Sequence, residues 1–492
     1  MTISKSMNIS LTGLKANQAA LNVVSHNIAN MNTEGYARQR VNFAEVRTTV
    51  NDNTVSGQIA SMSGVKVASI TTSANDYLNG YLGSQNSIYQ GLLADAESAA
   101  QLSDLMDSLK GTGLGDALSE FFNAANSLSQ NPTDYSLRIN FVEKAKYAAN
   151  KFNLMYSSVE GLQESKIGNG TQESADNSQI GSYVSLLNAD FHALEDVNRQ
   201  ISSNPDDANL KSKRDQLLAD ISSYTNVTTV INPSGTASVS IGNRDILLNN
   251  QLQGELSVGT NGEVKFTDLN NNVIDITANV TGGKLGGTLS GVSAVSDALS
   301  GIDDLASAFA TLMNGIQKYT NGNDAAASYD RASDRLVLST EDLFTTSDGS
   351  GAFTASNLII NDTVYNNPDL VAAARVDTSV TDWERSVGNG DNALAFYTSQ
   401  SERIPLLNNL TMGDYMNAMS TKAALNAASK AAAAETQGEI VDGIKNQILA
   451  ETGVNLDEEL TNMIMYQQAY NASARVFSTC VQVYDTLIAL GS

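Results

Sequence analysis

Few side chains of this 492-residue chain are of the types that carry acid–base or nucleophilic chemistry, because it has two histidines and one cysteine. His26 follows Ser25, but adjacent residues of a helix do not face each other, so a Ser–His dyad is not expected. His192 lies in a predicted helix, and we interpret it as structural. Cys480 also lies on a predicted helix, where a small semi-buried side chain explains it better than a nucleophile does. The sequence thus predicts no catalytic residue.

Metal and phosphate sites are also not expected. The segment 268–272 looks faintly like a calcium loop, but Val273 stands where the sharp turn needs glycine. The glycine-rich segment 282–287 lacks the Lys-Ser/Thr pair of a phosphate loop, and we interpret it as a turn before a helix. A single thiol forms neither an intrachain disulfide nor a cysteine-based zinc site. The composition does not exclude a catalytic pair of Asp or Glu residues, although no pair stands out by its spacing.

The charge and hydropathy patterns exclude two broad classes of partner. Lys and Arg number 29 against 53 Asp and Glu, which gives a formal charge of −24 and no basic surface for nucleic acid. No apolar run approaches the length of a transmembrane helix. Residues 1–10 lack the features of a cleaved signal peptide, so export would need a route that reads an uncleaved N-terminus.

The first segment of the chain has the pattern of an amphipathic helix. Its apolar residues recur every seven positions, and two more widen the stripe by steps of three and four. Polar residues and Gly35 predict that this helix stops near Asn30 and is followed by a loop. The stripe consists of Met7, Leu11, Leu14, Leu21, Val24 and Ile28.

The last segment has the clearest pattern in the chain. Apolar and small residues alternate at steps of four and three, which is the seam of helices that supercoil around one another. Either the two ends pair with each other, or both are left for partners such as further copies of the chain. The C-terminal stripe consists of Leu456, Leu460, Met463, Gln467, Tyr470, Ala474, Phe477, Val481, Tyr484 and Ile488.

Between the two ends, helical patterns alternate with short β patterns, so the predicted fold class is α+β and multidomain. Terminal helices form a coiled coil, and a helical-bundle middle domain carries antiparallel β insertions. Residues 36–71 are expected to be extended and irregular, with a strand-like alternation at Val65 and Val67, and a helix is expected from about 289 to 319. The predicted domains are 1–45 with 450–492 (terminal coiled coil), 46–225 with 286–320 and 386–449 (helical middle), 226–285 (β insert) and 321–385 (outer β-rich insert).

Residues 26–38 read HNIANMNTEGYAR, which closely resembles the N-terminal signature of bacterial flagellar rod, hook and hook-associated proteins. At the other end, residues 453–460 read GVNLDEEL, and YQQAY and ASARV follow from 466 and 472. This end resembles the hook-associated members of the family more than the hook and rod subunits. Weaker resemblance extends inward through most of the chain, but not through residues 321–385.

The resemblance implies a structural subunit, not an enzyme, at the junction between flagellar hook and filament. It implies export through the flagellar type III channel without signal cleavage, and an extracellular location. The implied partners are further copies of the chain in a helical tube, the hook protein, a second hook-associated junction protein on the filament side, and a cytoplasmic export chaperone on the C-terminal helix. In the implied assembly interface, Asn30 caps the first helix, Gly35 permits a turn, and Tyr36 anchors the loop on neighbouring subunits beside the two stripes.

Two alternatives remain at this stage. The chain is a hook or distal-rod subunit, or it is an adhesin displayed on a flagellar scaffold, with residues 226–385 as the binding part. The first differs from the leading interpretation only in the place of the subunit along the flagellum. The second requires a ligand site in the β insertions.

Overall fold

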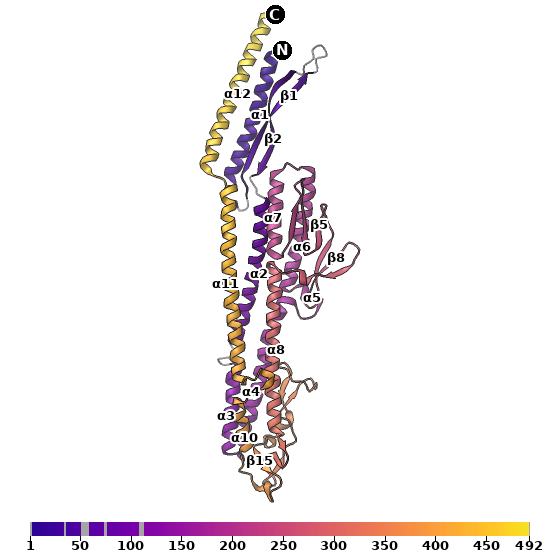
Figure 1. The fold of residues 1–492 in the computed structure, drawn as a ribbon, viewed down its shortest axis with the longest axis vertical. Coiled ribbons are helices and arrows are strands. Elements are labelled where there is room, and N and C mark those ends of the chain that lie inside the picture. Colours follow the sequence, from indigo (N-terminus) through magenta and orange to yellow (C-terminus); the bar gives the residue numbers. More distant parts are fainter. Residues whose placement is uncertain (1, 34–35, 51–58, 73–75, 108–112, 492) are drawn as a thin grey trace.

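The protein is a long helical rod whose two chain ends lie together at one tip (Figure 1). The computed structural model describes residues 2–33, 36–50, 59–72, 76–107 and 113–491. The rod has three parts along its length, which are a terminal domain, a helical middle with a β insert on its side, and a second β region at the far tip.

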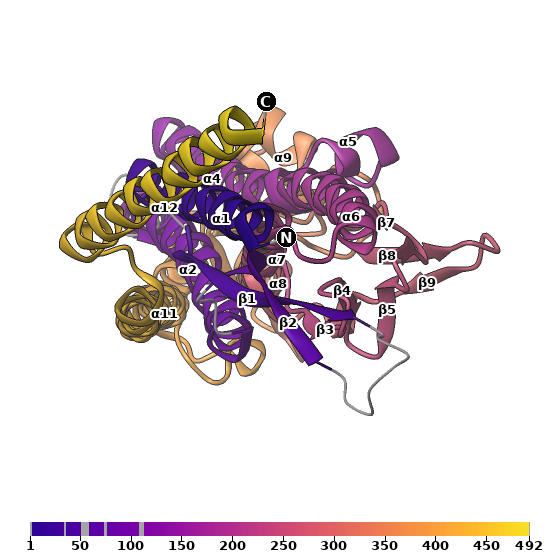
Figure 2. The same ribbon diagram turned by 90° about the horizontal axis from the view of Figure 1, so that it is seen from above.

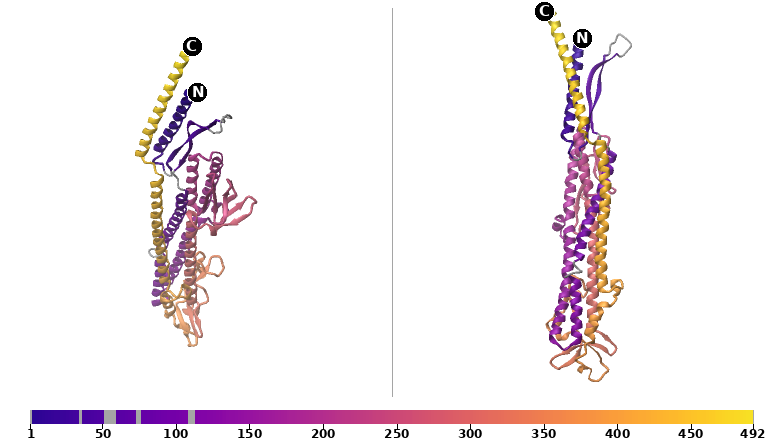
Figure 3. Two further views of the ribbon diagram at one scale, coloured as in Figure 1. Left: turned by 45° about the horizontal axis from the view of Figure 1, so that its top comes forward. Right: turned by 90° about the vertical axis from the view of Figure 1, so that its left-hand side faces the viewer.

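The terminal domain combines the first and last helices with a β-hairpin. Helix α1 (Thr2–Ala29) lies antiparallel to α12 (Leu456–Gly491), and the hairpin β1 (Gln39–Val50) and β2 (Ile59–Thr72) packs on α1 (Figures 1 and 3). Seen from above, α12 and the hairpin lie on different sides of α1 (Figure 2). The hairpin therefore leaves much of α12 uncovered.

The middle of the rod is a bundle of long helices around an aromatic core. Its main helices are α2 (Asp76–Asp107), α3 (Leu114–Gln130), α4 (Tyr135–Ile167), α8 (Gly283–Gln317) and α11 (Met412–Thr452). Phe309 of α8 is fully buried, and its ring centroid lies 5.4 Å from that of Phe121 and 5.6 Å from that of Phe152. The short α10 (Asp391–Thr398) closes this core with Phe396. The phenylalanines of this core all lie between residues 121 and 396, so neither terminal helix contributes to it.

The β insert packs on α6 (Gln179–Ser203) and forms a second core with it. Its seven strands make two antiparallel sheets of order β3-β4-β5-β6 and β7-β8-β9. Asn249 and Asn250 have φ of 51° and 62°, the left-handed conformation that a tight two-residue hairpin turn requires. The elements are α5 (Gln172–Asp176), α7 (Ala208–Tyr224), β3 (Thr228–Ile231), β4 (Ala237–Ile241), β5 (Arg244–Leu248), β6 (Gln251–Leu252), β7 (Gly254–Val258), β8 (Val264–Asp268) and β9 (Val273–Asp275).

The far tip of the rod holds two small antiparallel sheets. Strand β11 pairs with β10, β12 and β15, while β13 pairs with β14 against the aromatic core of the middle. Arg138, 1% exposed, donates from Nε to Pro132 O at 2.7 Å and from Nη1 to Val371 O at 2.8 Å, and so ties α4 to this region. The elements are β10 (Thr320–Asn321), β11 (Asp324–Asp330), β12 (Arg335–Leu338), β13 (Phe344–Thr346), β14 (Leu358–Ile360), α9 (Asp362–Asn366) and β15 (Ala374–Asp377).

Helices α2, α8 and α11 are held close together where they pass one another. A Cβ added at Gly287 of α8 would lie 2.0 Å from the Gly91 carbonyl oxygen of α2, so only glycine allows this crossing. Asp95 of α2, 6% exposed, accepts hydrogen bonds from Lys430 of α11 at 2.6 Å and from Ser290 of α8 at 3.0 Å. Because α11 leads directly into α12, this support positions the start of the terminal helix.

The predicted fold class is confirmed, but two local predictions were wrong. Residues 36–71 are largely paired in a hairpin instead of irregular, and register shifts at Asn42/Phe43 and Glu45/Arg47 interrupt the two-residue period that would reveal the strand. Strand β1 therefore runs across the boundary predicted at residue 45. Helix α8 begins at Gly283, not near 289, because its glycines serve the crossing with α2 instead of a turn.

Within the described ranges, none of the helices combines the length and apolar character that a membrane span requires.

Candidate assembly interface

In helix α1, small residues are more deeply buried in the terminal domain than most residues of the predicted stripe. Ala16, Ala20, Val23 and Val24 are buried, while the other stripe residues are only half-buried and Leu11 is 39% exposed. Small side chains let the two helices approach closely. A Cβ built at Gly13 would lie 3.7 Å from Ser473 Cβ of α12.

Helix α12 divides its predicted stripe between contact with α1 and exposure. Five residues of the stripe are half-buried, namely Met463, Tyr470, Ala474, Phe477 and Val481. The other five are exposed: the polar Gln467, and four apolar residues that are 40% to 55% exposed, namely Leu456, Leu460, Tyr484 and Ile488. At the end of α12, the exposed Tyr484 and Ile488 continue the apolar stripe over a part of the helix that α1 does not cover. Phe43 of the hairpin adds an edge contact to Tyr466, with ring centroids 6.2 Å apart.

A second apolar face of α12 was missed by the sequence analysis. We call Met465, Val476, Val483 and Leu487 the outer stripe, and each is 45% to 52% exposed. At about 100° per residue these four lie on one side of the helix, roughly 110° from the face that contacts α1. Their spacing of eleven, seven and four residues carried the signal, but the stronger seam of the other face obscured it.

Polar residues from both ends of the chain meet below this helix pair. We call Asn27, Tyr36, Arg38 and Glu459 the polar clasp. The Asn27 amide is fully used, because Nδ2 donates to Gln39 O at 2.9 Å and to Glu459 Oε2 at 3.1 Å. Its Oδ1 accepts from Tyr36 Oη at 2.8 Å and from the Gln39 backbone N–H at 3.0 Å. One side chain therefore joins the end of α1, the start of β1 and the first turn of α12.

Arg38 and Glu459 form the charged part of the clasp. Arg38 Nε donates to Glu459 Oε1 at 2.8 Å, and Arg38 Nη2 lies 2.6 Å from the same oxygen, so two guanidinium nitrogens converge on one carboxylate oxygen in a charge-assisted contact. The Glu459 side chain is 2% exposed, whereas Glu458, which Arg38 also contacts at 2.6 Å, is 59% exposed. The Arg38 backbone N–H donates to Thr452 O at 3.0 Å, which fixes the segment to the last turn of α11.

Tyr36 contacts its own chain. Its hydroxyl lies 2.9 Å from His26 Nδ1 besides donating to Asn27. Burial, followed by the nearby Glu459 carboxylate, raises the pKa of Tyr36 to about 12, so the phenol stays protonated and continues to donate at neutral pH. Asn30 ends α1 through its amide, which donates to His26 O at 2.9 Å. Gly35 lies outside the described residues.

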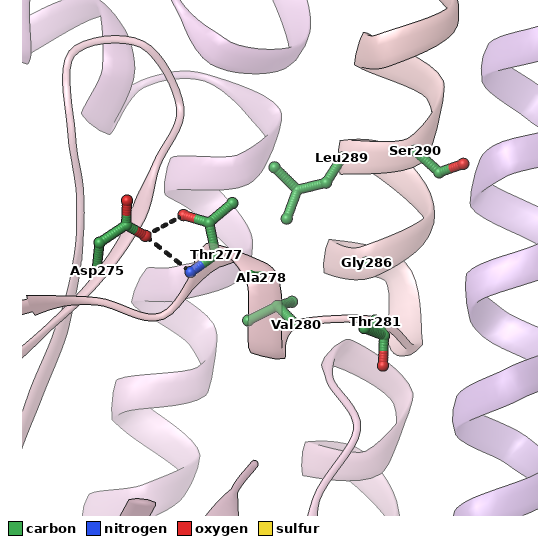
Figure 4. A pocket seen from close by; sticks show the side chains of 8 residues that line it. All are labelled: Asp275, Thr277, Ala278, Val280, Thr281, Gly286, Leu289 and Ser290. Atoms are coloured by element: carbon green, nitrogen blue, oxygen red, sulfur yellow. Dashed lines mark hydrogen bonds between the residues drawn. The ribbon is translucent and has the colours of Figure 1, made fainter. Parts of the chain in front are cut away.

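Outside the polar clasp, a cavity and a surface histidine bear on whether the described residues form a metal or ligand site. Among the described residues, no three metal-ligating side chains come together. A cavity of about 810 Å³ opens between residues 275–281 and the start of α8 (Figure 4). Of the described residues that line it, Asp275 alone is charged, and its pKa is lowered because the Thr277 side chain and backbone both donate to it, at 2.6 and 2.9 Å. His192 lies on the surface, 3.4 Å from Glu255.

Family models match both ends and the middle of the chain. The model described as the flagellar hook-associated protein FlgK helical domain matches residues 99–327. The flagella basal body rod protein model matches residues 7–36, which hold most of α1 and two members of the polar clasp. The model of the C-terminal region of the flagellar basal body rod FlgEFG proteins matches residues 445–490. Both terminal matches therefore fall on the helices that pack together here.

Whole proteins resemble the chain over its full length. Flagellar hook-associated protein 1 of Escherichia coli K12 is 25% identical over 99% of this chain and 100% of its own length. The protein of that name from Bacillus subtilis is 24% identical over 96% of each. The solved structure of the flagellar hook junction protein FlgK from Burkholderia pseudomallei has a TM-score of 0.58 at 14% identity, over 75% of this chain and 99% of that one, and supports the fold. The chain thus belongs to the flagellar family of rod, hook and hook-associated proteins, and its middle domain places it with the hook-associated members.

Proposed function

We propose that the chain is a structural subunit of the bacterial flagellum that forms the junction between hook and filament. The observation that carries this proposal is the terminal domain, in which α1 and α12 pair within one chain and still leave an apolar face of α12 open. A soluble monomer has no use for such a face, but a subunit of a tube buries it against its neighbours.

The proposed assembly surface has two parts. The residues of both stripes that are half-buried between α1 and α12 hold the terminal domain together. The outer stripe and the exposed residues Leu456, Leu460, Tyr484 and Ile488 contact neighbouring copies. Asn30 and Tyr36, which the family resemblance assigned to the same interface together with Gly35, lie beneath these helices, where Asn30 ends α1 and Tyr36 donates to Asn27.

The proposed partners follow from this position in the flagellum. The chain contacts further copies of itself, the hook protein on one side and a second hook-associated protein on the other. Export runs through the flagellar type III channel, with a cytoplasmic chaperone holding the C-terminal helix before assembly. The exposed apolar faces of α12 support this step, because such a helix needs cover until its neighbours are in place.

The structural role is favoured over the alternatives. A hook or distal-rod subunit shares the terminal helices, but the middle of this chain matches the helical domain of the hook-associated proteins instead. The cavity beside Asp275 offers a ligand one carboxylate that is already engaged by its own turn, which gives little support for an adhesin or an enzyme.

Deletion of the gene tests the proposal in the organism that encodes the chain. We expect cells that carry intact hooks without filaments, do not swim, and release flagellin into the medium. Electron micrographs of the cell surface show whether filaments are present, and immunoblots of the medium show whether flagellin is released. A plasmid copy of the gene should restore the filaments and stop the release of flagellin. Cells without hooks would indicate a hook or rod subunit instead, and normal filaments would contradict the proposal.

A further inference from the structure

The contact between α1 and α12 does not fix its own register. The face of α1 consists largely of small residues, among them Gly13, Ala16 and Ala20, which fit against many partners. The facing seam of α12 repeats every seven residues, with Met463, Tyr470, Phe477 and Tyr484 at equivalent positions. A shift of one helix by seven residues would therefore place similar side chains in similar positions, at little cost in apolar contact.

The polar clasp removes this ambiguity. Asn27 faces Glu459, and two heptads away along both helices Gly13 faces Ser473. The ion pair and the amide thus lie in the same antiparallel register as the close contact higher up. A shift of seven residues would bring Tyr466 or Thr452 to the place of Glu459 and leave the Arg38 guanidinium, 11% exposed, without its buried partner. Buried polar groups that lose their partners are costly, so the clasp penalises a slipped pairing strongly.

We infer that Glu459, through Arg38 and Asn27, is the positioning residue that sets the register of α1 against α12. This inference deepens the proposed function, because it says what aligns the helices that would form the tube wall. The clasp also ties that register to the rod, since the Arg38 backbone bonds to Thr452 at the end of α11. Terminal helices in the wrong register would present the outer stripe at the wrong height to a neighbouring copy.

Disulfide crosslinking of the full-length protein measures the register directly. The pair Gly13→Cys and Ser473→Cys, in a Cys480→Ser background, reports the native register, because 3.7 Å between the Cβ positions suits a disulfide. Gly13→Cys with the native Cys480 reports a slip of one heptad, since Cys480 lies seven residues beyond Ser473. Both pairs are oxidised under the same mild conditions, and the crosslinked fraction is read on non-reducing gels.

We expect the native pair to crosslink and the slipped pair to remain reduced. Glu459→Gln keeps the shape of the side chain but removes its charge. With this substitution we expect the native crosslink to fall at least about fivefold and the slipped crosslink to appear. Glu458→Gln is the matched control, because it removes the exposed carboxylate that contacts the same arginine, Arg38. This substitution should leave both crosslinks unchanged.

Each other outcome decides against the inference. An unchanged native crosslink in Glu459→Gln would show that the clasp does not set the register. Gly13→Cys with Tyr466→Cys, in the Cys480→Ser background, reports a slip in the other direction. Loss of the native crosslink with neither slipped crosslink would show that the clasp only holds the helices together. A native crosslink missing from the parent protein would show that the helices do not adopt this pairing in solution. Swimming of cells that carry the same substitutions is scored separately, so failure of the flagellar role would leave the crosslinking result standing.

Discussion

We expect removal of the residues after Gly453 to abolish filament attachment while leaving a folded, soluble middle domain. Truncation at this point deletes α12 and with it Glu459, the facing seam and the outer stripe. The two main cores lose nothing, because every residue of theirs lies before residue 453. We therefore expect the thermal midpoint of the middle domain to change by less than about 4 °C, which is about the shift that 1 kcal/mol causes in a domain of this size.

Two measurements check this prediction. Calorimetry of the purified truncated protein reads the stability of the middle domain, and electron microscopy of the deletion strain that carries it reads filament attachment. The protein content of the medium shows separately whether the truncated chain is exported. Filaments attached in the presence of the truncated chain would contradict the proposed role of α12, and loss of the main thermal transition would contradict the described division of the cores.

The second large effect is expected from two charges on the outer stripe. Val476→Asp together with Val483→Asp should abolish swimming while leaving the isolated protein as stable as its parent. Both valines are about half exposed in the single chain, so the substitutions cost little there. In the proposed tube they are buried, where each unpaired carboxylate would cost several kcal/mol in every subunit. Such a cost exceeds the contribution of the exposed half of a valine, which is about 1 kcal/mol.

The matched control places the same two charges on the polar face of the same helix. Ser478→Asp together with Gln482→Asp lies on exposed positions of α12, and we expect the cells to swim. Circular dichroism of both purified proteins checks that α12 remains helical to the same extent. Swimming cells with charged valines would exclude the outer stripe from the assembly surface, and two immobile strains would show that α12 tolerates no added charge on either face.

The sequence predicted the terminal helices well and their connections poorly. Stripes of seven-residue period are local signals, and α1 and α12 both occur where those stripes lie. The clasp has no local signal, because Arg38 and Glu459 are 421 residues apart along the chain. In the sequence, Glu459 follows Asp457 and Glu458 at the start of a helix, where the helix dipole favours acidic residues and is sufficient to explain all three.

The assembly residues could be predicted only in part for a related reason. A seam tells which side of a helix is apolar, but not how much of it the same chain covers. Val24 is buried by its own fold, while Leu460 and Ile488 remain exposed. The outer stripe could be distinguished from the seam only in the structure, where the position of α1 shows which face of α12 is in contact and which is exposed. The hairpin was missed because its bulges break the alternation on which strand prediction depends.

The chain is proposed to form the junction between hook and filament. Immunogold labelling of intact flagella tests this role most directly, with antibodies raised against the purified protein and the deletion strain as the blank. We predict gold particles in one narrow zone at the boundary between hook and filament. Labelling along the hook, along the filament, or on no part of the flagellum would contradict the account.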